Sequence, residues 1–362
     1  MQRTLCNIAK KLFLVLVFIV LLTSCSKQEA QFFIFKRYDS KTDRWKYYKT
    51  NLYAPSRVEE INTIPCSDDK RVQPVWSPDG KYYGCGAVYD QPLLIRDVHN
   101  TITAKLDQGN LKDPILWNIK GWSPDSQYVS IMNTGSKGKP YYDFSIMKYD
   151  GTQLRQIFKL SRAAIDVGEW SPNGKYILVE EVDKQCSFII FNTSGTEIAR
   201  FDLSKLVNSL MVDPKNTKWS PDSKKLAFGV YDNRDVSSKL FVLDIGSGKI
   251  TDITPDEPIC IITIFDWSPD SKDLLFDAIM CKEHVSGDFS GRISYSIHVD
   301  GSNLKALTGK GNGSLHWALD GKSIIMDGYE GKDIYLMDID GNNKKKLVAV
   351  GDYTYFVSWI RP

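Results

Sequence analysis

The feature that most constrains the fold is a short motif that recurs along the whole chain. Trp219-Ser220-Pro221-Asp222-Ser223-Lys224 is one copy, and near copies begin at Trp76, Trp122, Trp170 and Trp267, with a degenerate copy at Trp317 and a shortened one at Trp359. The spacings between successive tryptophans are 46, 48, 49, 48, 50 and 42 residues. A fixed period in this range is typical of repeat architectures. The sequence therefore predicts one array of similar units.

Each unit contains four short segments with the character of β-strands. In one unit these segments are residues 217–219, 226–231, 240–244 and 250–253. Turn dipeptides such as Asp150-Gly151 and Asp300-Gly301 separate the third and fourth segments, and such pairs favour tight hairpins. No long helical period follows residue 24. An all-β chain with evenly spaced strands and one Trp per unit predicts a β-propeller.

The motif itself has a physical explanation. Proline at the second position of Ser-Pro-Asp-Gly presets φ for a type I turn, the Asp or Asn accepts hydrogen bonds from nearby amides, and Gly or Ser closes the turn. We expect each Trp to pack between neighbouring sheets, where its large side chain fills the core between blades.

The two ends of the chain decide the number of blades. Residues 32–38, 45–53 and 59–64 are three candidate strands without a Trp motif, and residues 353–359 are a first strand without partners. Together they complete one blade, so we predict that residues 32–362 form a seven-bladed propeller of four-stranded antiparallel blades, closed by its two ends. Six blades with an extra N-terminal segment is the alternative.

The N-terminus has the pattern of a bacterial lipoprotein signal peptide. Arg3, Lys10 and Lys11 precede an apolar run of 11 residues, 12–22, which is too short to span a bilayer as a helix. Leu22-Thr23-Ser24-Cys25 then resembles a lipobox. We expect residues 1–24 to be a signal peptide, Cys25 to carry a diacylglyceryl group and an acyl chain such as palmitate, and 25–31 to be a tether. The alternatives are an ordinary signal peptide or a short anchor helix.

This pattern predicts an extracytoplasmic lipoprotein, held at the outer membrane or at the outer leaflet of the cell membrane. Removal of the three basic residues of the leader leaves 43 basic and 44 acidic residues, so the charge does not favour nucleic acid as a partner. Membrane attachment would come from the lipid alone.

Five cysteines remain besides Cys6 and Cys25, and an exported protein can form disulfides. Cys260 and Cys281 flank the same hairpin, on either side of Trp267, and we predict a disulfide between them; two buried free thiols are the alternative. The pairing of Cys66, Cys85 and Cys186 is left open.

The sequence offers no catalytic constellation. It lacks a Gly-x-Ser-x-Gly motif and a Cys/His cluster with metal spacing, so we predict no cofactor and no metal. His316 lies just before a motif Trp on an expected innermost strand, where it could face the channel; a hydrogen-bonded structural histidine is the alternative.

Binding residues are expected on the face with the long, dissimilar loops, because function concentrates on variable loops held by a rigid scaffold. The alternative is that aromatic–acidic pairs at strand ends only cap the strands. The candidates are Tyr89, Asp90, Tyr141, Tyr142, Tyr231, Asp232, His284, Tyr329 and Glu330.

The motif, followed by an aliphatic strand and then by Asp300-Gly301-Ser302-Asn303-Leu304-Lys305, resembles the TolB-type, WD-like propeller repeat. The resemblance covers nearly all of residues 32–362 and implies a propeller with a central channel, commonly a protein-binding platform in exported bacterial proteins. TolB has a further N-terminal α/β domain with no counterpart between Cys25 and Phe32, so its Tol–Pal partnership does not carry over.

The sequence thus predicts a monomeric, lipid-anchored propeller that binds an unknown protein or peptide without catalysis. Two alternatives stay open. One is a lyase or glycan-processing enzyme with its site at the channel mouth, and the other is a glycan-binding module.

Overall fold

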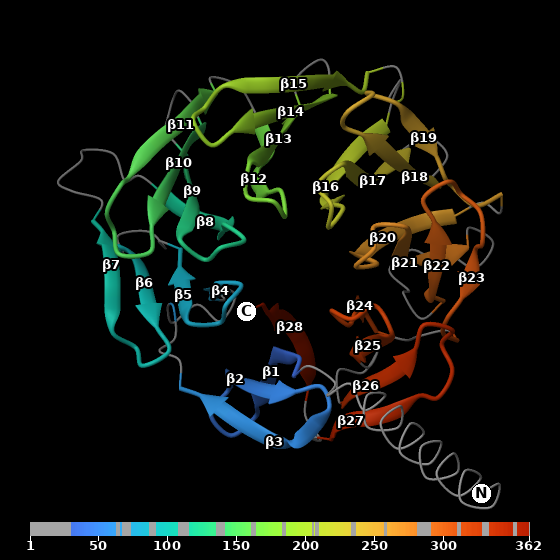
Figure 1. Ribbon diagram of the computed structural model, residues 1–362, viewed down its shortest axis with the longest axis horizontal. Helices are drawn as coiled ribbons and strands as arrows, with labels where there is room; N and C mark the ends of the chain where they lie inside the picture. Colours follow the sequence, from blue (N-terminus) through green and yellow to red (C-terminus); the bar gives the residue numbers. More distant parts are fainter. Residues whose placement is uncertain are drawn as a thin grey trace, which may run out of the picture.

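The structure is a computed structural model that describes residues 30–62, 66, 74–86, 92–107, 116–134, 142–160, 164–182, 186–204, 206, 210–232, 237–256, 259–280, 291–309, 313–327, 333–349 and 353–361. These residues form strands, turns and loops, and none of them belongs to a helix long and apolar enough to cross a membrane. Seven four-stranded antiparallel sheets are arranged in a ring (Figure 1), which confirms the predicted propeller.

We number the blades I to VII along the chain. Blade I contains β28 (Thr354–Ile360), β1 (Phe32–Asp39), β2 (Arg44–Asn51) and β3 (Ala54–Ile61). Blade II contains β4 (Val75–Trp76), β5 (Tyr82–Cys85), β6 (Leu93–Asp97) and β7 (Ile102–Leu106). Blade III contains β8 (Leu116–Trp122), β9 (Tyr128–Thr134), β10 (Tyr142–Lys148) and β11 (Arg155–Leu160). Blade IV contains β12 (Ala164–Trp170), β13 (Tyr176–Val182), β14 (Cys186–Asn192) and β15 (Glu197–Asp202).

The remaining blades follow the same order. Blade V contains β16 (Leu210–Trp219), β17 (Lys225–Asp232), β18 (Ser237–Asp244) and β19 (Ile250–Asp252). Blade VI contains β20 (Ile259–Trp267), β21 (Asp273–Met280), β22 (Ile293–His298) and β23 (Lys305–Ala306). Blade VII contains β24 (Leu315–Trp317), β25 (Ser323–Asp327), β26 (Asp333–Asp338) and β27 (Lys345–Ala349).

The core is divided among the seven contacts between neighbouring blades. The buried apolar residues form seven clusters, each cluster draws on two adjacent blades, and each contains one motif Trp. All seven motif tryptophans are buried, with at most 9% of their surface exposed. This confirms the predicted packing role of the tryptophan, because a lone four-stranded sheet could not bury both of its faces.

The ends of the chain meet in blade I. The last strand, β28, pairs with β1, with Phe33 opposite Trp359 and Arg37 opposite Thr354 (Figure 1). Strand β3 begins at Ala54, so the predicted start at residue 59 is wrong. The amide of Tyr53 donates to the Asn51 side chain in the tight turn before it. Strand β3 is mostly exposed, so it lacks the apolar alternation that marks a half-buried strand.

The turns follow the predicted chemistry. In blade II the Gly80 amide donates to the Ser77 carbonyl at 2.9 Å, and the Asp79 carboxylate accepts the Lys81 amide at 3.0 Å. Strand direction places these turns, and the turns between third and fourth strands, on one face of the ring. We call it the short-turn face, and the opposite face the loop face.

Candidate functional site

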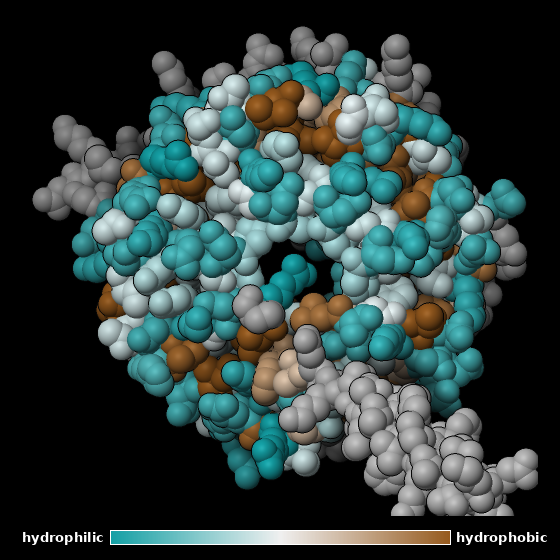
Figure 2. Space-filling view, viewed as in Figure 1, coloured by the Kyte–Doolittle hydropathy of each residue, from teal (hydrophilic) through white to brown (hydrophobic). Residues whose placement is uncertain are grey.

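The innermost strands surround the centre of the ring, and Figure 2 shows an opening there, bordered mainly by hydrophilic residues on the face in view. The Trp267 indole donates to the Lys218 carbonyl of the preceding blade at 3.0 Å, so this Trp faces backwards. Side chains alternate along a strand, so the residue before each Trp faces the next blade. We call these residues the channel column: Val75, Gly121, Glu169, Lys218, Asp266, His316 and Ser358.

Four consecutive members of the channel column are ionisable, from Glu169 to His316. Asp266 accepts the amides of Trp267 at 2.9 Å and of Trp317, in the next blade, at 3.0 Å. Burial raises the pKa of Asp266 to about 6, and these hydrogen bonds oppose the shift. The carboxylate thus joins blades VI and VII at the channel.

His316 is the one predicted channel residue, and it lies on β24. Its ring stacks on Phe356 of blade I, with 4.2 Å between ring centroids. Burial lowers the pKa of His316 to about 3, and the positive charge of Lys218 adds to this shift. The imidazole is therefore neutral at pH 7. A pKa this far from neutral fits a ring packed in the structure better than a group that transfers protons at pH 7.

A second group of residues lies at the loop-face end of blade I. We call it the aromatic–lysine cluster: Lys36, Tyr38, Trp45 and Tyr355, all half-buried. The Lys36 ammonium lies 4.8 Å from the Trp45 ring centroid and 5.9 Å from that of Tyr355. Tyr38 and Tyr355 pack edge-on to Trp45, at 5.4 and 5.7 Å. An ammonium group over an aromatic face makes a favourable cation–π interaction, which holds Lys36 against Trp45.

A buried carboxyl adjoins this cluster. Asp327 ends β25 on the loop face, and its side chain accepts the Ser314 amide at 2.6 Å. Burial raises the pKa of Asp327 to about 7. Burial lowers the pKa of Lys36, while the charge of Asp327 opposes that shift. The group offers aromatic surface and charge for recognition, and it contains no activated nucleophile.

The predicted loop candidates fall mostly outside the structure's described part. Tyr142 begins β10, and Tyr231 and Asp232 end β17, so their backbones lie at the loop face, and the binding role predicted for them stays a prediction. Outside the described residues lie Cys25, Tyr89, Asp90, Tyr141, Cys281, His284, Tyr329 and Glu330, and the roles predicted for them stay predictions.

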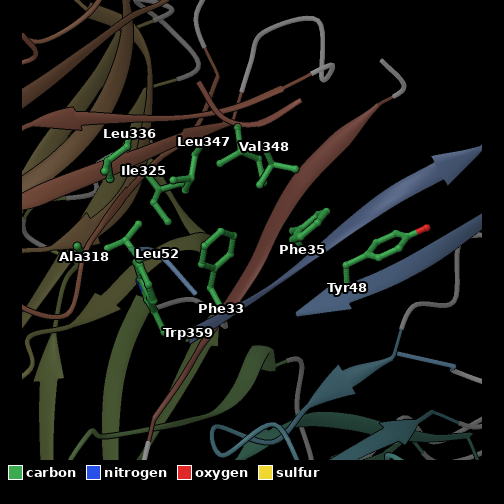
Figure 3. Packing of buried hydrophobic residues seen from close by; sticks show 11 residues of the cluster. Phe33, Phe35, Tyr48, Leu52, Ala318, Ile325, Leu336, Leu347, Val348 and Trp359 are labelled. Carbon is green, nitrogen blue, oxygen red and sulfur yellow. The ribbon is translucent and has the colours of Figure 1, made fainter. Parts of the chain in front are cut away.

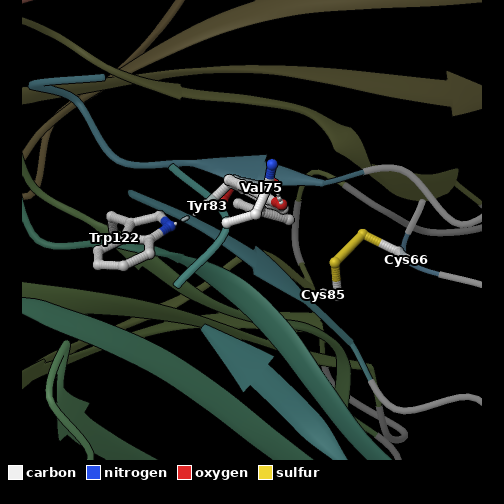
Figure 4. Close-up of a disulfide and its surroundings, with 6 residues drawn as sticks. Cys66, Val75, Tyr83, Cys85 and Trp122 are labelled. Atoms are coloured by element: carbon white, nitrogen blue, oxygen red, sulfur yellow. Dashed lines mark hydrogen bonds between the residues drawn. A yellow bond between two sulfur atoms is a disulfide. The ribbon is translucent and has the colours of Figure 1, made fainter. Parts of the chain in front are cut away.

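The structure contains a disulfide whose pairing the sequence analysis left open. Cys66, in the connection from blade I to blade II, forms a disulfide with Cys85 of β5 (Figure 4). Cys260 is the extra residue of a bulge in β20, since Ile259 pairs with Met280 and Ile261 with Ile279. Its predicted bond to Cys281 stays a prediction.

Sequence reasoning missed the channel column apart from His316, and it missed the aromatic–lysine cluster. Two signals were present. Trp45 is a tryptophan outside the repeat, and the residue before each motif Trp varies while the motif does not. Within the ranges that the structure describes, no three His, Cys, Asp or Glu side chains come together as metal ligands.

Comparison with solved structures gives the same architecture at low identity. An oligogalacturonate lyase from Vibrio parahaemolyticus has 10% identity and a TM-score of 0.58, covering 87% of this chain and 95% of its own. An oligogalacturonate lyase in complex with manganese has 10% identity and a TM-score of 0.57, covering 82% of each chain. The β-propeller domain of the Trilobed protease from Pyrococcus furiosus has 14% identity and a TM-score of 0.53, covering 77% of this chain and 82% of its own.

No curated protein matches the chain significantly. The family described as the TolB beta propeller domain matches residues 122–354, which is more than half of the sequence. The matched segment runs from the motif Trp of blade III to the first residue of β28. The chain therefore belongs to the TolB β-propeller family.

Proposed function

We propose that the chain is a lipid-anchored, extracytoplasmic propeller that binds a protein or peptide through its loop face and performs no catalysis. The observation that supports it most is the aromatic–lysine cluster. Tryptophan and tyrosine dominate binding hot spots in protein interfaces. Here Trp45 and Tyr355 are half-buried, and Tyr353, beside them on the loop face, is 53% exposed.

The cluster suits a protein partner better than a sugar. A sugar needs a free aromatic face on which to stack. Lys36 lies over the ring of Trp45, and Tyr38 and Tyr355 pack edge-on to it, so much of this ring is already engaged. What remains are ring edges with a nearby ammonium group, which can contact apolar side chains and an acidic residue of a peptide.

Export is supported by two independent features. The sequence before residue 26 has the order of a lipoprotein signal, and a disulfide joins Cys66 to Cys85. Structural disulfides are typical of oxidising compartments outside the cytosol. The enzymatic alternative rests on fold likeness to lyases at 10% identity, and fold alone does not carry an activity.

Site-specific photo-crosslinking in cells would test the proposal. A photoreactive residue at Tyr353 should capture a partner, whereas one at Leu304, 45% exposed on the short-turn face, should not. Trp45→Ala should reduce the Tyr353 cross-link about tenfold or more, the scale of a hot-spot residue. Equal capture from both faces, or an unchanged yield with Trp45→Ala, would contradict the proposal.

Two further experiments test the lipid anchor at Cys25 and the enzymatic alternative. Cys25→Ser should move the chain from the membrane fraction to the soluble one. The purified chain should release no unsaturated product from oligogalacturonate, and release of such product would favour the lyase instead.

A further inference from the structure

A cleft opens between blades I and VII, the two blades that meet where the ring closes. It has a volume of about 520 Å³, within the usual range of small-molecule sites. Its walls come from β1, β2 and β3 on one side and from β27 on the other (Figure 3). The lining residues that matter here are Phe35, Arg37, Tyr48, Val58, Leu347 and Val348.

Most of the cleft wall is apolar. The rings of Phe35 and Tyr48 stack with 5.2 Å between centroids and 19° between planes. Leu347 and Val348 of the neighbouring blade belong to the same core cluster (Figure 3). Val58 on the outer strand is 44% exposed. The cleft therefore offers an aromatic wall and an aliphatic wall to an apolar group.

Arg37 supplies the one cationic group in this lining. Its guanidinium lies 5.3 Å from the Tyr48 ring centroid, and its Nε is buried with no hydrogen-bond partner among the residues that the structure describes. The nearby carboxylates are engaged elsewhere, since Lys46 pairs with Asp39 at 3.0 Å and with Glu60 at 3.9 Å. A buried N–H of a charged group without an acceptor is costly, so a bound acceptor would relieve that cost.

We propose that this cleft binds a small amphiphilic anion, with its carboxylate on Arg37 and its apolar part between the two walls. A carboxylate matches the planar guanidinium fork and needs only one cation, whereas a phosphate dianion would be left with excess charge beside Asp39 and Glu60. The carboxylate could belong to a free acid or to the C-terminus of a peptide that ends in an apolar residue.

This site is distinct from the aromatic–lysine cluster. Lys36 and Arg37 are neighbours on β1, so their side chains point to opposite faces of the blade. Arg37 faces blade VII with Phe35, and Lys36 lies on the opposite face with Trp45 and Tyr355. Anion binding at Arg37 is therefore independent of the proposed partner binding.

Calorimetric titration of the full chain would test the site with soluble probes. Octanoate and 3-phenylpropanoate represent free acids, and N-acetyl-Gly-Leu represents a peptide C-terminus; each is paired with its neutral amide. At least one acid should bind. Its amide should bind at least about tenfold more weakly, because a charge-assisted hydrogen bond is lost. The acid that binds more tightly identifies the source of the carboxylate.

Variants then assign the binding to the cleft. Arg37→Gln should weaken the acid about tenfold, and Val58→Trp, which fills the cleft from an exposed position, should abolish binding. Arg57→Gln is the matched control, since it removes the same charge from an exposed neighbour on β3 that does not line the cleft. Equal binding of acids and amides, equal losses in Arg37→Gln and Arg57→Gln, or no binding of any acid at millimolar concentration would overturn the site.

Discussion

At the scale of single residues, the channel column and the motif tryptophans follow different rules. Each Trp fills the same gap between two sheets, so the same residue recurs at every repeat. The residue before it faces the next blade, where each position has its own neighbours. Asp266 bridges two backbone amides, and His316 stacks on Phe356. This column is therefore where the repeats acquire individual chemistry.

The shifted pKa of His316 predicts a stability that depends on pH. Its pKa is lowered to about 3 in the folded protein, while an unperturbed histidine titrates near pH 6.5. As pH falls from about 6.5 towards 3, the unfolded chain binds a proton that the folded protein does not, so stability falls. Relative to His316→Gln, the wild type should lose free energy of unfolding by up to about 1 kcal/mol per pH unit below pH 6.

Asp327→Asn is the matched variant with the opposite sign. The carboxyl of Asp327 has its pKa raised to about 7, so between pH 7 and 4 the folded protein binds a proton that the unfolded chain lacks. The wild type should gain stability relative to Asp327→Asn as pH falls through this window. Urea denaturation of the three proteins at pH 7.5, 6 and 5 measures both slopes. Parallel profiles would show that neither group titrates as described.

At the scale of elements, the motif turns of neighbouring blades are linked through a hydroxyl where the fifth motif residue is serine and lack this link where it is glycine. Where the fifth motif residue is serine, its hydroxyl accepts an amide from the turn of the preceding blade, as in Asn173 N–H to Ser223 at 3.0 Å and Asp222 N–H to Ser271 at 3.1 Å. Where it is glycine, this bond is missing. The position has positive φ in either case, +59° at Ser223 and +70° at Gly174. Serine thus accepts backbone strain and gains a bond between blades.

This balance predicts an order of stability at Ser223. Ser223→Ala keeps the strained φ and removes the acceptor of the part-buried Asn173 amide, and it should cost about 1 kcal/mol. Ser223→Gly loses the same bond but relieves the left-handed conformation, so its cost should be close to zero. Guanidinium denaturation measures the order.

The reciprocal change serves as control. A Cβ at Gly174 would lie 3.7 Å from Pro124, an ordinary contact, but φ there is +70°. Gly174→Ser should therefore add backbone strain and gain a hydroxyl acceptor for the turn of the preceding blade, with a net change within about 1 kcal/mol. A Ser223→Gly variant less stable than Ser223→Ala would show that the hydroxyl bond is not what decides this position.

At the scale of the whole molecule, the repeat and its closure could be predicted because they depend on local patterns. Each Trp motif marks one turn, and the unmatched strands at the two ends could only complete a blade together. The aromatic–lysine cluster and the cleft could not be predicted. Lys36 and Tyr355 come from opposite ends of the chain and are neighbours only because β1 pairs with β28. Within the described part of the chain, Lys46 and not Arg37 pairs with the nearby carboxylates of Asp39 and Glu60, which depends on side-chain positions.

The disulfide also could not be predicted from the repeat pattern. Cys66 lies in a connection between blades, where no strand register fixes its neighbour, so the repeat pattern does not predict its pairing with Cys85. Its position has a consequence for the ring. It ties the connection that leaves blade I to the second strand of blade II, while the same blade I is held together by the pairing of β1 with β28.

A ring closed without a covalent bond between its ends should open first at that closure. The disulfide encloses a loop with a sequence separation of 19 residues, and cross-links of this size contribute about 3 kcal/mol. Removing it with the double substitution Cys66→Ser and Cys85→Ser should therefore destabilise blade I and its contact with blade II. Amides of β28, β1 and β5 should exchange faster with deuterium, whereas those of β13 and β17 in the distant blades IV and V should change little. A reducing agent should reproduce the faster exchange of β28, β1 and β5 in the wild type and leave the exchange of these three strands unchanged in the double variant. Equal loss of protection in all seven blades would mean instead that the ring unfolds as one unit and that the closure is not its weakest contact.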